Sequence, residues 1–185
     1  LTPDVGLCCT TNPIWELPGL RIPRIMQEMN YGCGSTVHAR DLTNNPKMLY
    51  VGVGGGMELL QFAYFNRQTA GVIGIDVVDE MLEASKQNFK EAEVLNPWFK
   101  SDFVELKKGD AMNLPVEDNS IDVAAQNCLF NIFKADDLKK AIAEMYRVLK
   151  PHGRLVMSDP TCEQPMNDEL RMRIQDLQIS QYIPL

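Results

Sequence analysis

The chain has 185 residues, of which 45% are hydrophobic and 23% charged, and its formal net charge is −7. These values predict one globular domain, alone or with a small appendage. The negative charge argues against a nucleic-acid partner, and the lack of a long uncharged apolar stretch argues against a membrane partner. Five cysteines are an odd number and no secretory leader is visible, so we expect thiols in a cytoplasmic protein rather than a disulfide framework.

Residues 1–46 are irregular and rich in proline, and we expect them to form a cysteine-containing leader or cap. From residue 47 onward, short apolar runs alternate with segments of helical spacing. The runs lie at residues 48–53, 71–76, 103–106, 121–125 and 154–157. Helical patterns cover 57–66, the stretch after Asp79 and the stretch after Asp136, and these two acids are suited to cap their helices.

This alternation predicts an α/β domain over residues 47–160, with a doubly wound, mostly parallel sheet and helices on both faces. Residues 161–185 are polar and broken, and we expect an irregular or helical tail that is incomplete. The prediction is therefore a sheet of five parallel strands that lacks C-terminal strands.

A glycine loop joins the first expected strand to the first expected helix, with glycines at positions 52, 54, 55 and 56. Glycines let the backbone turn sharply and approach a ligand closely. Asp76 ends the second expected strand, where a carboxylate can accept both ribose hydroxyls of an adenosine. A third segment, GDAMNLP at 109–115, follows the third strand, and there Asp110 could accept the adenine amino group while Ala111 donates its N–H. The alternative is a tight turn beside an ordinary acid.

Taken in order, the glycine loop, the second-strand acid, the GDA-x-x-LP segment, SID at 120–122 and RVLKPHG at 147–153 resemble the class I S-adenosylmethionine-dependent methyltransferases over residues 47–160. The resemblance implies a Rossmann-like fold and S-adenosylmethionine as cofactor. Tyr50 stands where this family usually has an acid, so another residue must orient the methionine end of the cofactor. To the cofactor site we assign Gly52, Gly54, Asp76, Val77, Asp110, Ala111 and Asn127.

The cysteines bear on the methyl acceptor. Cys128 follows the fourth expected strand, and ligands bind outside the carboxyl ends of such strands, so we expect Cys128 to face the transferable methyl group. Soft thiolates suit a thiophilic centre such as trivalent arsenic, whose lone pair can attack a methyl group without a general base. The alternative is that each cysteine has no role in binding and is simply a small residue of the core or of a turn.

The CC pair in the leader, YGCGS at 31–35 and NC-x-x-N at 127–131 resemble motifs of the arsenite methyltransferase family. The resemblance implies that Cys33 and Cys128 are catalytic and that Tyr31 lines the cofactor pocket. It further implies arsenic ligation by cysteines drawn from Cys8, Cys9, Cys33 and Cys128. Arsenite or a methylated arsenical would be the substrate, a thiol would be the reductant, and the role would be arsenic detoxification. The family's later cysteine has no counterpart near residues 177–180.

Two other functions stay open on the sequence. The first is methyl transfer to carbon or oxygen of a quinone- or sterol-like small molecule, which the cofactor motifs fit equally well. The second is a module that binds S-adenosylmethionine without catalysis.

Overall fold

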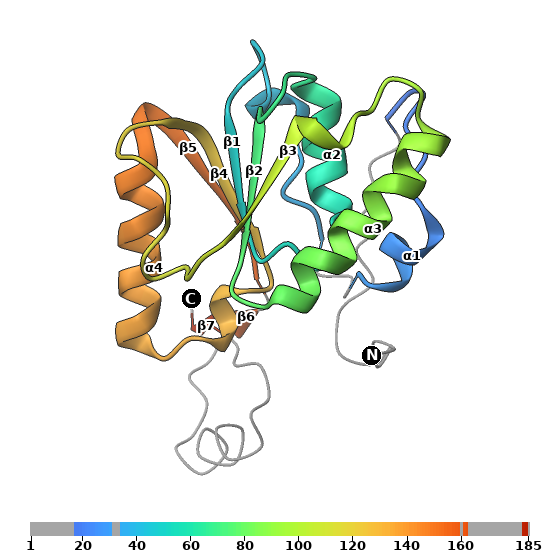
Figure 1. The fold of residues 1–185 in the computed structure, drawn as a ribbon. Coiled ribbons are helices and arrows are strands. Elements are labelled where there is room, and N and C mark those ends of the chain that lie inside the picture. The colour runs from blue at the N-terminus through green and yellow to red at the C-terminus, as the bar shows by residue number, and fades with distance from the viewer. Residues whose placement is uncertain (1–16, 31–33, 160, 163–182, 185) are drawn as a thin grey trace.

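A computed structural model of the chain describes residues 17–30, 34–159, 161–162 and 183–184 (Figure 1). Its centre is a five-stranded sheet in the order β3-β2-β1-β4-β5, and every pairing in it is parallel. The strands are β1 (Met48–Val51), β2 (Val72–Asp76), β3 (Val104–Lys108), β4 (Ile121–Asn127) and β5 (Leu149–Ser158). The prediction of five parallel strands is confirmed. A separate parallel pair, β6 (Thr161–Cys162) with β7 (Ile183–Pro184), was not predicted.

Helices cover both faces of the sheet (Figure 1). One face carries α1 (Arg24–Glu28), α2 (Met57–Phe65) and α3 (Asp79–Leu95), and the other carries α4 (Ala135–Val148). Three short 3-10 helices complete the elements: η1 (Ala39–Asp41), η2 (Ser101–Phe103) and η3 (Phe130–Ile132). The sheet is therefore doubly wound, as the alternation of strands and helices predicts.

The strands bury side chains on both faces. Along β1, Met48 and Tyr50 join the core beneath α2 and α3, whereas Leu49 and Val51 join the core beneath α4. All four residues are buried, because alternate side chains of a strand point to opposite faces and both faces are covered. The inner strands β1, β2 and β4 are buried in this way, so they appear in the sequence as mostly apolar runs.

The prediction that Asp79 and Asp136 cap their helices is wrong. Helix α3 has Val78 at its N-cap and α4 has Lys134 there, and neither residue makes a side-chain capping hydrogen bond. The Asp79 carboxylate instead pairs with Lys108 Nζ at 2.5 Å. The Val78 N–H is bound by the Asp76 side chain, so the acid that orients the start of α3 lies at the end of β2.

Residues 17–30 extend along the helical layer, from the end of α3 to the glycine loop. The Asn96 side chain, just past α3, accepts from Arg21 N and donates to Arg21 O, both at 2.7 Å. Helix α1 then lies on the glycine loop, where a Cβ on Gly55 would come within 3.0 Å of Met29 Cβ. The leader segment is thus part of the wall around the loop.

The order of the strands fixes where a ligand can bind. From β1 the chain steps outward to β2 and β3, and it then returns to place β4 on the other side of β1. The loops that leave β1 and β4 therefore part in opposite directions, which opens a crevice at the carboxyl ends of these two strands.

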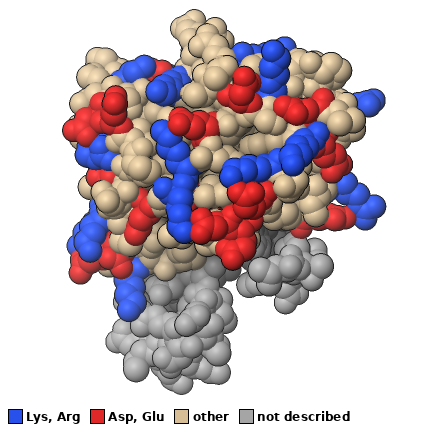
Figure 2. Space-filling view, viewed as in Figure 1, with Lys and Arg blue, Asp and Glu red and all other residues tan. Residues whose placement is uncertain are grey.

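Lys and Arg side chains are interspersed with Asp and Glu over the face drawn in Figure 2, with no continuous basic patch. The expectation that nucleic acid is not a partner stays a prediction. Among the described residues, no helix is both long and apolar enough to cross a membrane.

Candidate active site

The glycine loop after β1 has a backbone conformation that residues other than glycine rarely adopt. Gly52, Gly54 and Gly56 all have positive φ, at 85°, 50° and 83°. A Cβ built on Gly54 would meet no heavy atom within 4 Å, so this residue borders open space. Left-handed backbone without a side chain exposes the peptide groups here, as close approach of a ligand requires.

Asp76, the acid at the end of β2, is held in a fixed orientation. Its Oδ2 accepts the Val53 N–H and its Oδ1 accepts the Val78 N–H, both at 2.9 Å. One carboxylate thereby joins the glycine loop to the start of α3. Its remaining lone pairs are available to hydroxyl donors.

A cavity of about 240 Å³ opens between the carboxyl ends of β1 and β4, and we refer to it as the central cavity. Its wall combines exposed peptide groups of the glycine loop, two carboxylates and four methionine side chains. The lining residues are Met26, Met29, Asn30, Tyr50, Gly52, Val53, Gly54, Gly55, Met57, Glu58, Asp76, Met81, Asn127, Cys128 and Leu129.

Glu58, in the first turn of α2, is the most highly connected side chain of this wall. Its Oε1 accepts from Ser35 Oγ (3.2 Å), Thr36 N (2.7 Å) and Thr36 Oγ1 (2.9 Å). Its Oε2 accepts from the Tyr50 hydroxyl and from Asn127 Nδ2, the latter at 3.1 Å. Burial, and then the neighbouring Glu58 charge, raise the pKa of Tyr50, so the phenol stays protonated and donates. One carboxylate thus joins the leader, β1, α2 and β4.

The end of β4 brings Asn127 and Cys128 to the cavity. Asn127 Nδ2 also donates to Gly34 O at 2.9 Å, and its buried Oδ1 has no hydrogen-bond partner in the described part of the chain. Cys128 has a φ of 55°, a left-handed conformation uncommon for a residue with a side chain. Its N–H donates to Ser158 O at 2.8 Å, and its sulfur is disulfide-bonded.

The turn that carries Cys128 is held by a buried amide. Gln126 Oε1 accepts the N–H groups of Leu129 (2.9 Å) and Phe130 (3.3 Å), and its Nε2 donates to the Asp159 carboxylate. Burial raises the pKa of Asp159, against the opposing effect of the Gln126 hydrogen bond. Unusual backbone of this kind persists where the surrounding contacts over-determine it, and it concentrates at functional sites.

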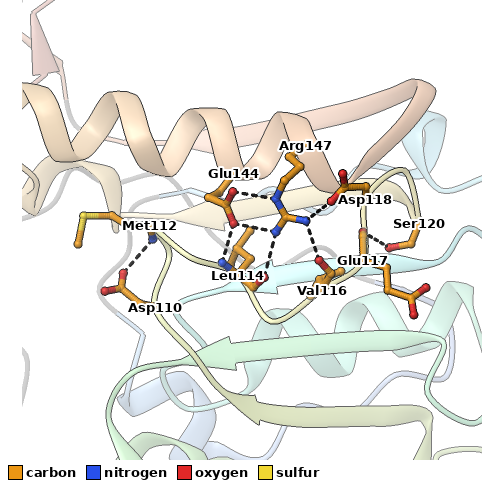
Figure 3. A network of polar contacts seen from close by, with 9 residues as sticks. All are labelled: Asp110, Met112, Leu114, Val116, Glu117, Asp118, Ser120, Glu144 and Arg147. Atoms are coloured by element: carbon orange, nitrogen blue, oxygen red, sulfur yellow. Dashed lines mark hydrogen bonds and ion pairs between the residues drawn. The ribbon is translucent and has the colours of Figure 1, made fainter.

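The loop after β3 is clamped by α4 (Figure 3). Arg147 donates to the carbonyls of Val116 (2.9 Å) and Leu114 (3.0 Å), while Glu144 Oε2 accepts the Leu114 N–H at 2.8 Å. Arg147 also pairs with Glu144 and with Asp118. The hydrogen bond from Arg147 lowers the pKa of Glu144. In turn, the hydrogen bonds to Glu144 and then to Asp118 raise the pKa of Arg147.

Within this loop, Asp110 is exposed and its Oδ1 accepts the Met112 N–H at 2.8 Å, which makes a local turn. Ala111 is buried in the core beneath α4, and Val77 is 62% exposed. These three residues lie outside the cavity wall given above. Their contacts with a cofactor stay predictions.

The structure therefore brings five predicted residues together around one cavity: Gly52, Gly54, Asp76, Asn127 and Cys128. Tyr31, Cys33, Cys8 and Cys9 lie outside the described residues. Glu58 was missed, although its place in the first turn after a glycine loop was a usable signal. Within the described part of the chain, no group of three or more His, Cys, Asp or Glu side chains could hold a metal ion.

Comparison with known families settles the class of protein. The family described as "Methyltransferase domain" matches residues 49–157, which is more than half of the chain. The chain belongs to the methyltransferase domain family. S-adenosylmethionine is accordingly its methyl donor.

Curated relatives share part of this methyltransferase's sequence. It is 30% identical to an arsenite methyltransferase of Aquipseudomonas alcaligenes over 89% of this chain and 47% of that protein. It is 28% identical to an arsenite methyltransferase of Halobacterium salinarum over 78% of this chain and 35% of that protein. A demethylmenaquinone methyltransferase of Listeria welshimeri is 39% identical over 48% of this chain and 34% of its own length. The chain thus spans less than half the length of each.

The fold also matches solved structures. The YcgJ protein of Bacillus subtilis superposes with a TM-score of 0.60 and 24% identity, over 80% of this chain and 64% of that one. This likeness confirms the α/β Rossmann-like methyltransferase fold.

The central cavity fits the donor. An adenosine needs an acceptor for its ribose hydroxyls and close backbone approach, which Asp76 and the uncovered Gly54 offer. The methionine end carries an ammonium donor, and the buried Asn127 Oδ1 is an acceptor without a partner in the described part of the chain.

Proposed function

We propose that this methyltransferase transfers the methyl group of S-adenosylmethionine to thiol-bound trivalent arsenic. The observation that carries the proposal is the position of Cys128, which lines the central cavity at the end of β4. The similarity to two arsenite methyltransferases, each over more than three quarters of this chain, supports the same acceptor.

In this proposal Gly52, Gly54, Asp76 and Asn127 hold the cofactor. When bound, S-adenosylmethionine supplies an electrophilic methyl group, whose carbon–sulfur bond breaks with the electron pair left on sulfur. The Cys128 thiolate would hold arsenic so that the arsenic lone pair faces that methyl group. The gain in rate comes from the alignment of the lone pair with the methyl group. A thiol reductant returns the oxidised arsenic to the trivalent state.

Cys128 is disulfide-bonded in the structure, so it must be reduced before its sulfur can bind arsenic. This requirement supports a thiol reductant as partner. A reducing compartment also suits such a reaction, and we propose a cytoplasmic location. Participation of Cys33, Cys8, Cys9 and Tyr31 stays a prediction.

A second candidate is methyl transfer to a quinone. It is favoured by the 39% identity to the demethylmenaquinone methyltransferase, although that match covers about half of the chain. The residues assigned to the cofactor suit both methyl acceptors, so the choice between arsenic and a quinone rests on Cys128.

The test is transfer of a labelled methyl group from S-adenosylmethionine, with arsenite plus a dithiol in one arm and a demethylated quinone in the other. We expect labelled methylarsenic from the unaltered chain and none from Cys128→Ser, which replaces a soft ligand by a hard one of similar size. Cys162→Ser is the matched control and should retain activity. Full arsenite turnover by Cys128→Ser, or turnover of the quinone alone, would contradict the proposal.

A further inference from the structure

Glu58 is a buried charge without a cation to balance it. Its side chain lines the central cavity, and the residue is 4% exposed. Its hydrogen-bond donors are three hydroxyls, one amide and one backbone N–H, all of which are neutral. Among the described residues, Lys, Arg and His form no ion pair with it.

A buried carboxylate of this kind is costly. Five donors replace the water that it loses, but they leave its net charge in place. The Tyr50 phenol cannot offset that charge, because burial and Glu58 itself raise its pKa and keep it neutral. Asp76 adds a second carboxylate to the wall of the same cavity.

These two carboxylates therefore favour a negative potential inside the cavity. Opposite charges attract each other more strongly at such a site than they do in bulk water. A ligand with positive groups gains this attraction, and a neutral ligand of the same shape does not.

We propose that Glu58 is a specificity-determining residue that selects cofactor-site ligands by positive charge. Between ligands that share the same α-carboxylate, it favours S-adenosylmethionine, with an ammonium and a sulfonium, over S-adenosylhomocysteine, whose one positive group is the ammonium. It gives no preference to methylthioadenosine, which has neither. The inference rests on the placement of the cofactor in the central cavity and is independent of the methyl acceptor.

The test is calorimetric titration of these three ligands into the unaltered chain and Glu58→Gln, without arsenite. The expected loss of affinity is graded: none for methylthioadenosine, on the order of tenfold for S-adenosylhomocysteine, and more for S-adenosylmethionine. Equal losses of affinity for all three ligands would show that Glu58 merely shapes the cavity. No loss of affinity for any of them would show that its charge does not affect binding. Both outcomes overturn the proposal.

Two controls separate charge from architecture. Thr36→Val removes a hydroxyl that donates to Glu58 but keeps the charge and the shape, so it should lower stability and leave the ratios of the three affinities unchanged. Asp76→Ala should weaken every ligand, methylthioadenosine included, since all three carry the ribose. If Asp76→Ala has no effect, the placement of the cofactor is wrong, which is a separate failure.

Should Glu58→Gln fail to fold, the double variant Tyr50→Phe/Glu58→Gln takes its place. Its amide oxygen still accepts from the Ser35 and Thr36 donors, and the phenol that donated to the second carboxylate oxygen is removed. The same graded loss is expected from it, and equal affinity losses for the three ligands would again overturn the proposal.

Discussion

Replacing Arg147 by methionine should loosen the clamp between α4 and the loop at residues 110–118. The guanidinium donates to the Leu114 and Val116 carbonyls, and each such bond contributes about 1 kcal/mol. The pair with Glu144 is partly buried and adds about 1 kcal/mol, whereas Asp118 is 68% exposed and adds little. We expect a loss of about 2–3 kcal/mol in the free energy of unfolding. For a chain of this size, that loss lowers Tm by about 4–12 °C.

The assay is thermal and urea unfolding followed by circular dichroism at pH 7, with Lys139→Met as the matched control. Lys139 pairs with Asp136 on the surface of the same helix, with side chains 78% and 88% exposed, so its loss should change little. A free energy of unfolding for Arg147→Met within about 0.5 kcal/mol of the unaltered chain would refute this reasoning.

The same contact predicts a dependence on pH. Arg147 lowers the pKa of Glu144 below its unfolded value, so their interaction stabilises the fold above that unfolded pKa. The contribution is lost as the pH falls through the folded pKa. The difference in stability between the unaltered chain and Arg147→Met should therefore shrink in acid, and a difference that stays constant down to pH 3 would contradict the assignment.

Two further predictions concern the walls of the central cavity. Gly54→Val should abolish S-adenosylmethionine binding in calorimetry while the fold persists, because the φ of 50° disfavours a β-branched residue and its side chain would enter the cavity; binding at the original affinity would contradict the position of the loop. Asn96→Leu should free the Arg21 segment by removing two hydrogen bonds, and limited trypsin cleavage at Arg21 or Arg24 should become several-fold faster. An unchanged cleavage rate would show that other contacts hold this segment.

The core of the fold could be predicted because parallel strands buried on both faces carry a strong local signal. The beginning of β5 could not. Residues 151–153, Pro-His-Gly, look like a stop between helix and strand, yet β5 begins at Leu149, directly after α4. The pairing jumps from Ile121↔Leu149 to Val123↔Arg154, so the intervening residues form an irregularity within the strand. Lys150 pairs with Asp122 across it, and this long-range contact leaves no local pattern.

The candidate site was predictable to a similar extent, and for the same reason. Gly52, Gly54 and Asp76 follow a local rule, in which a backbone turn and a strand end adjoin a ligand. Val77 and Asp110 are also near such features. Val77 is 62% exposed and Asp110 accepts the Met112 N–H, and their contacts with a cofactor stay predictions. Sequence position places a residue at the correct edge of the sheet, whereas the direction of its side chain depends on packing.

Tyr50 shows where a position-by-position comparison stops being informative. The sequence raised a question about a missing acid at the end of β1, and at that position the structure has a phenol that donates to a carboxylate eight residues further on. The donors that Glu58 gathers lie as far away as Asn127, which is 69 residues distant in the chain. A negative charge at this end of the cavity can thus be kept while the residue that carries it moves from a strand to a helix. Because such an exchange depends on contacts that only the folded chain creates, it has to be tested by charge, as the graded affinities of Glu58→Gln would do, rather than by motif.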